Sequence, residues 1–195
     1  MRMKDHKMLA EFLASEIEGS ISNIYVKAFV LGNIEPDCNP FTYLHGWLLG
    51  RKLHGHNYEN ILPVMRKMFC SLQKKECFGI QEYYHLGKLI HYVADAFTFP
   101  HNQVFEGNLR THCEYERNLH KKFECMLKKQ KNIFQTETLI QGFHNIEILH
   151  EKYMHEAGTR EGDCKYIMQA TRQVFRAEYQ NVHYRETIKN ERLVG

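Results

Sequence analysis

The chain has 195 residues, 43% hydrophobic and 25% charged, a balance typical of one folded domain covering residues 1–195 rather than of a disordered chain. Its formal net charge of +3 is too small to favour nucleic acid or an anionic membrane surface as a partner. No segment is long and apolar enough to span a membrane, and the N-terminal segment lacks the apolar core of a secretory signal, so we expect a cytoplasmic protein.

The predicted elements are all helices. Leu9, Leu13 and Ile17 recur with helical spacing and predict a helix over residues 5–31, which the turn-rich residues 32–40 should end. Further helices are expected, in chain order, at 41–53, 58–76, 80–98, 107–131, 136–157 and 163–189, with a loop at 54–57. No long segment alternates with period two, and only four prolines occur, so we expect an all-α fold: one bundle of six to seven helices.

The segment HYVADAFTFPH, residues 91–101, is the first candidate for a functional site. His91 and Asp95 are four residues apart, which places both side chains on the same side of a helix. That helix is the most apolar of the chain, and an aspartate without a partner would be costly to bury in it. Two interpretations remain open from the local sequence: a metal site, or a buried His–Asp pair that satisfies itself.

Spacing alone is weak evidence, because 13 histidines and 23 acidic residues produce about 1.5 pairs of this kind by chance. His112 and Glu116 form a second pair. His120 and Glu124 form a third, in a lysine-rich stretch where we expect only an exposed contact. The segment HEKYMH (150–155) resembles a zinc protease motif, but its histidines are five residues apart and diverge around a helix.

The order of the candidates along the chain is more informative than any single pair. The positions concerned are Leu86, Gly87, His91, Asp95, His101, His112 and Glu116. This order and spacing resemble those of the zinc-dependent phospholipase C family, whose helical fold is shared with single-strand-specific fungal nucleases. Upstream, EPDCNPF resembles the family's Pro-Asp segment at Asp37, and HGHN supplies its next histidine, with His56 preferred over His54. His6 matches an early histidine of the family.

The resemblance implies two to three zinc ions. One ion would be held by Asp37, His56, His91 and Asp95, and a second by His101, His112 and Glu116. Asp95 would bridge to a third ion held by His6. In the secreted phospholipases an N-terminal tryptophan adds a further ligand, whereas this chain begins Met-Arg-Met and its only tryptophan is Trp47.

The expected function is therefore zinc-dependent hydrolysis of a phospholipid or a similar phosphodiester by an activated water molecule. By resemblance, Asp37 would accept the proton of that water. A nuclease-like hydrolase of the same fold is one alternative, disfavoured by the modest net charge. A catalytically weakened helical protein that only binds zinc is the other, favoured by the missing tryptophan.

Overall fold

The computed structural model describes residues 1–17, 21–38, 57–129, 140 and 142–194, with side chains described up to residue 182. Within these ranges the elements are α1 (Met3–Ser15), α2 (Asn23–Cys38), α4 (Tyr58–Gln73), α5 (Ile80–Ala96), the 3-10 helix η1 (Phe99–His101), α6 (Leu109–Lys129), α7 (His144–Glu156) and α8 (Arg160–Val194). The described residues contain no strand, so the all-α prediction is confirmed. Among them, no helix combines the length and apolar character needed to cross a membrane.

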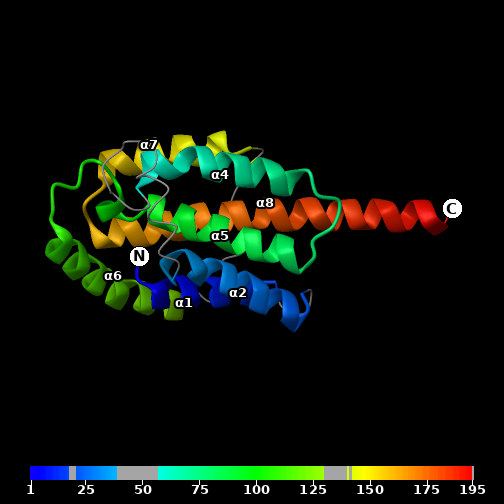
Figure 1. Ribbon diagram of the computed structural model, residues 1–195, viewed down its shortest axis with the longest axis horizontal. Helices are drawn as coiled ribbons and strands as arrows, with labels where there is room; N and C mark the ends of the chain where they lie inside the picture. The colour runs from blue at the N-terminus through cyan, green and yellow to red at the C-terminus, as the bar shows by residue number, and fades with distance from the viewer. Residues whose placement is uncertain (18–20, 39–56, 130–139, 141, 195) are drawn as a thin grey trace.

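Helix α5 lies at the centre of the bundle, beside α8 (Figure 1). Helices α4 and α7 lie on one side of this pair, and α1, α2 and α6 lie on the other. The C-terminal half of α5 is buried almost all round, from Leu89 to Ala96. Residues in this stretch can therefore contact side chains from several helices at once. A site built from segments that are distant in sequence can form here.

Helices α2 and α5 touch through their backbones. A Cβ atom added to Gly32 would lie 2.0 Å from the carbonyl oxygen of Tyr84, and one added to Gly87 would lie 2.1 Å from that of Phe29. Only glycine, which has no Cβ atom, fits at such distances. The close approach brings the last turns of α2 against the segment of α5 that carries His91.

The structure corrects the prediction for residues 5–40. One helix over 5–31 was expected, but α1 ends at Ser15 and α2 begins at Asn23. The turn expected at 32–40 is wrong for residues 32–38, because α2 continues to Cys38 with Pro36 inside it. Residues 39–40 lie outside the described residues. Gly32 is a packing residue rather than a helix breaker, and Pro36 removes a single hydrogen bond from a helix that tertiary packing supports.

The remaining helix predictions agree with the structure to within several residues at the ends that it describes, and their residues 130–131 and 136–139 lie outside the described residues. The expected helices at 58–76, 80–98, 107–131, 136–157 and 163–189 correspond to α4, α5, α6, α7 and α8. The expected helix at 41–53 and nearly all of the loop at 54–57 lie outside the described residues. Asn57 begins the next described segment and caps α4, accepting a hydrogen bond from the backbone N–H of Asn60 at 3.1 Å.

Candidate metal centre

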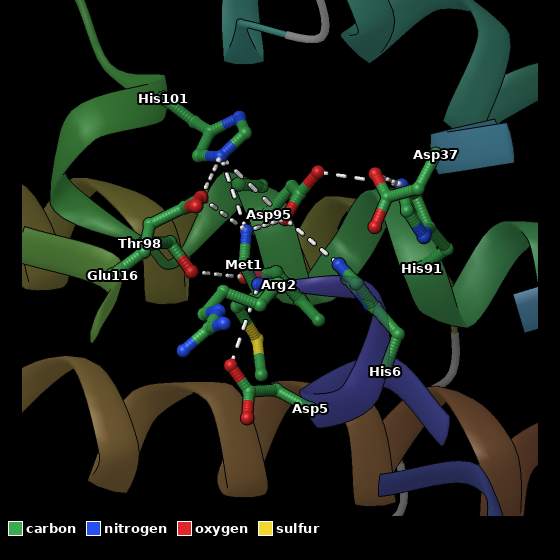
Figure 2. A network of polar contacts seen from close by, with 12 residues as sticks. Met1, Arg2, Asp5, His6, Asp37, His91, Asp95, Thr98, His101 and Glu116 are labelled. Atoms are coloured by element: carbon green, nitrogen blue, oxygen red, sulfur yellow. Dashed lines mark hydrogen bonds and ion pairs between the residues drawn. The ribbon is translucent and has the colours of Figure 1, made fainter. Parts of the chain in front are cut away.

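The candidate side chains meet around Asp95, near the C-terminal end of α5 (Figure 2). His91 and Asp95 are one turn apart, and their side chains are 0% and 1% exposed. After α5 ends, the turn through Thr98 and Pro100 reverses the chain and returns His101 towards Asp95. The Nε2 atom of His101 lies 3.7 Å from Asp95 Oδ1.

A first group of donors consists of His6, Asp37, His91 and Asp95, whose donor atoms all lie within 4.8 Å of one another. His6 Nε2 is 3.2 Å from Asp95 Oδ1, and His91 Nε2 is 3.4 Å from Asp95 Oδ2. Asp37 Oδ1 lies 3.7 Å from His91 Nε2. The rings of His6 and His91 stack with their centroids 3.8 Å apart. Helices α1, α2 and α5 thus place four potential ligands at one point.

A second group consists of His101, His112 and Glu116, again with donor atoms within 4.8 Å of one another. Glu116 Oε1 lies 3.3 Å from His101 Nε2 and 3.1 Å from His112 Nε2. His112 and Glu116 share one face of α6, whereas His101 comes from η1. All three side chains are partly exposed, whereas in the first group only Asp37 is, and all three line a pocket.

The amine of Met1 lies between the two groups (Figure 2). Its nitrogen is 2.5 Å from Asp95 Oδ1, 3.1 Å from Glu116 Oε1 and 3.1 Å from His101 Nε2. Burial lowers the pKa of this amine, but the carboxylates of Asp95 and Glu116 more than offset that effect and raise it to about 11. Spacing along the sequence gives no signal for this contact, because Met1 and Asp95 are 94 positions apart.

Asp95 interacts electrostatically with members of both donor groups and with the Met1 amine. Burial acts to raise the pKa of its carboxyl, but His101, the Met1 amine and the other nearby imidazoles hold it well below its usual range. Burial together with the neighbouring His91 lowers the pKa of His6 to about 3, so His6 is neutral at pH 7. Burial raises the pKa of Asp37 to about 6. The centre combines an ionised carboxylate with a neutral imidazole, the protonation states in which these groups bind metal.

The hydrogen bonding of His91 shows that the first group suits a metal ion. His91 Nδ1 lies 2.8 Å from the carbonyl oxygen of Asn33, to which it donates. The other ring nitrogen of His91, Nε2, faces the carboxylates of Asp95 and Asp37. Asp95 Oδ2 is buried and accepts no hydrogen bond within the described residues. The carboxylates of Asp95 and Asp37 repel one another, and a bound cation would remove that repulsion. Imidazole nitrogen and carboxylate oxygen are both ordinary ligands of zinc.

A pocket of about 1140 Å³ opens beside the two groups. Asp37, His101, His112 and Glu116 line one part of it. Arg2 and the apolar side chains of Met3, Phe105 and Leu109 also line it, and Leu109 is 79% exposed. A molecule in this pocket would meet all three side chains of the second group, Asp37 of the first group and an apolar surface.

Four further histidines named in the sequence analysis lie outside the two donor groups. His56 and its alternative His54 lie outside the described residues. His120 is not the exposed contact expected: its side chain is 15% exposed and Nδ1 bonds the buried Asp5 of α1, because α6 packs on α1. His150, the first histidine of HEKYMH, is buried, and its Nε2 donates to Asn102 Oδ1 at 2.9 Å.

Comparison with known proteins gives one match. A sequence model of the zinc-dependent phospholipase C family matches residues 5–160. This range runs from α1 to the start of α8 and contains every side chain of both donor groups. No curated protein and no solved structure matches the chain.

Proposed function

The chain belongs to the zinc-dependent phospholipase C family, and on that premise we propose that it hydrolyses a phosphodiester bond of a phospholipid or a similar phosphodiester. The observation that carries the proposal is that the second donor group opens onto a pocket that Asp37 of the first group also lines. A purely structural metal site would have its ligands closed off by protein, whereas a catalytic site keeps a position open for water or substrate. His101, His112 and Glu116 line the pocket and so provide such a position.

The two groups define where zinc would be held. Asp37, His91 and Asp95 would hold one ion, with His56 completing the set. His101, His112 and Glu116 would hold a second ion. His6 and Asp95 would hold a third ion beside the Met1 amine, which would give a total of two to three ions. Bound zinc would neutralise charge on the phosphate and lower the pKa of water towards about 7, which supplies hydroxide at neutral pH.

The protein's own residues would perform the other tasks. Asp37 lines the pocket, and we assign it the acceptance of a proton from the attacking water. Asn33 holds His91 in one tautomer, so that Nε2 always faces the site. Asp95 keeps its negative charge through its contacts with both groups. These roles need no movement of the helices, because α2 and α5 are in backbone contact beside the site.

The lining of the pocket favours an amphiphilic substrate. The donor groups are largely buried, whereas Met3 and Leu109 are 49% and 79% exposed and so lie towards the mouth. A phosphodiester at the donors would leave its apolar part against these side chains. This arrangement suits a phospholipid better than a nucleic acid, which would call for a basic groove with aromatic stacking surfaces.

The test is activity with and without metal. Protein treated with a chelator is assayed on phospholipid vesicles of several headgroups, on a water-soluble phosphodiester and on single-stranded DNA, before and after zinc is returned. We expect activity on phospholipid that is lost on chelation and restored by zinc. Full activity of the metal-free protein would contradict the proposal, and cleavage of DNA alone would replace it with the nuclease function. His112→Ala, tested for folding by circular dichroism, is the control for adventitious activity.

A further inference from the structure

Asp163 is a buried carboxylate that belongs to neither donor group. It lies in the first turn of α8, is 0% exposed and accepts three hydrogen bonds. Its Oδ2 accepts from the backbone N–H of Phe99 at 2.9 Å and from the hydroxyl of Tyr115 at 3.0 Å. Its Oδ1 accepts from the hydroxyl of Tyr153 at 2.8 Å. A buried carboxylate is tolerated only when its oxygens are bonded in this way.

Two of these donors are close neighbours of residues in the second group. Phe99 is the first residue of η1, which ends at His101, and its N–H is one of the amides that a helix leaves without an internal partner. Tyr115 precedes Glu116 on α6. A single oxygen of Asp163 therefore joins the element that carries His101 to the element that carries Glu116.

The turn that contains His101 is braced internally by Asn102. Its Nδ2 donates to the carbonyl oxygens of Ala96 and Thr98, both at 3.1 Å. These bonds fix the shape of the turn, but they do not fix its position relative to α6. That position depends on contacts between elements, and the bonds to Asp163 are contacts of this kind.

An aspartate in the first turn of a helix also has an ordinary explanation, since its charge interacts favourably with the helix dipole. Within the described residues, however, the three hydrogen bonds of the Asp163 carboxylate come from η1, α6 and α7, and none comes from an amide of α8. The side chain is thus directed away from its own helix and towards the site.

We propose that Asp163 is a positioning residue that holds His101 and Glu116 at the separation required to bind the second zinc ion. The inference rests on the proposed function, because it presupposes that the second group binds zinc. Ligands held in place before the metal arrives need no ordering on binding, so the loss of such a support lowers metal affinity, by about 10- to 100-fold for groups that orient ligands.

Tyr115 and Tyr153 provide a matched test. Tyr115→Phe and Tyr153→Phe each remove one hydroxyl that donates to Asp163, but only Tyr115 lies on an element with a zinc ligand. Each is made in the full chain carrying His91→Ala, so that the second group dominates zinc binding. Zinc affinity is measured by competition with a chromophoric chelator, the geometry of the site by the absorption spectrum with cobalt, and folding by urea denaturation.

Tyr115→Phe and Asp163→Ala should each lower zinc affinity by about tenfold or more and alter the cobalt spectrum, whereas Tyr153→Phe should change affinity by less than about twofold. Asp163→Asn should bind zinc more tightly than Asp163→Ala, because the amide oxygen of asparagine can still accept a hydrogen bond from the N–H of Phe99. Equal effects of the two tyrosine variants, or unchanged zinc affinity in both Tyr115→Phe and Asp163→Ala, would overturn the inference. If the His91→Ala parent and the unmodified chain both bind no zinc, the proposed function fails and this inference with it.

Discussion

The imidazole of His91 donates from Nδ1 to the backbone carbonyl of Asn33, at 2.8 Å. The bond links α5 to α2 at the point where Asp37, one turn after Asn33, reaches the same imidazole from its other side. It forms because the two helices approach closely enough for the carbonyl to come within reach of the ring. Packing between α2 and α5 therefore determines the orientation of a candidate ligand.

Gly87 should accordingly matter for metal binding as well as for stability. In Gly87→Ala the new Cβ would lie 2.1 Å from the carbonyl oxygen of Phe29, so α2 and α5 must separate. Overpacking of this kind costs about 1–3 kcal/mol, and the shift should weaken the bond between His91 and Asn33. We expect a lower free energy of unfolding in urea and less than one equivalent of zinc at the first group.

Gly142→Ala is the matched control, because a Cβ at Gly142 meets no atom of the described residues within 4 Å. The same chemical change there should leave zinc content and the free energy of unfolding nearly unchanged. If Gly87→Ala bound zinc as the unmodified chain does, the link between helix packing and ligand orientation would be refuted.

Asp95 is the residue whose loss should affect both groups. It contacts His6 and His91 on one side and His101 and the Met1 amine on the other. Asp95→Asn keeps the size of the side chain but removes the negative charge on which these contacts depend. We expect zinc content, measured by elemental analysis, to fall by more than one equivalent per chain, with hydrolysis lost.

His112→Ala provides the comparison for Asp95→Asn, because His112 belongs to the second group alone. It should remove about one equivalent of zinc and leave the first group occupied. A loss of one equivalent or less in Asp95→Asn would show that Asp95 serves a single site and does not bridge.

The predictions from sequence worked best where the relevant interactions are local. Helical periodicity located α4 to α8, and the spacing of four residues placed His91 with Asp95 and His112 with Glu116 on common helix faces. Both pairs are in contact in the structure. The assignment of these side chains as zinc ligands came from the order of motifs and stays a prediction.

Interactions between residues distant in sequence had no local signal. Phe99 and Asp163 are 64 positions apart, and His120 and Asp5 are 115 apart, so neither bond could be read from spacing. Gly32 suggested the end of a helix in the sequence, yet its role is to allow contact with α5. In each case the contact forms because of how the helices pack against one another. That packing depends on the whole chain and not on the local sequence.

His150 should make stability depend on pH. It is buried, and burial lowers its pKa to about 4, below the ordinary value of 6.5. As pH falls from 6.5 to 4, the unfolded chain binds a proton that the folded chain does not, so stability decreases. The contribution of this residue is about 3 kcal/mol at most, from the difference between the two pKa values.

The measurement for His150 is urea denaturation at several pH values between 4 and 7, on the unmodified chain and on His150→Gln. Glutamine can still donate to Asn102, but it does not titrate. The variant should lose stability at every pH, and its stability should fall less steeply below pH 6.5. Parallel curves for the two proteins would show that His150 does not contribute to acid sensitivity.

Leu109 should affect the choice of substrate. Its side chain lines the pocket and is 79% exposed, so an acyl chain covering it would gain hydrophobic contact. Leu109→Ser should lower kcat/KM on long-chain phospholipid roughly tenfold, equivalent to about 1.4 kcal/mol, and leave a water-soluble phosphodiester nearly unaffected. Ile148→Ser, on the exposed surface of α7, is the control for general loss of surface hydrophobicity. Equal losses on both substrates in Leu109→Ser would mean that the apolar mouth of the pocket does not contact the lipid.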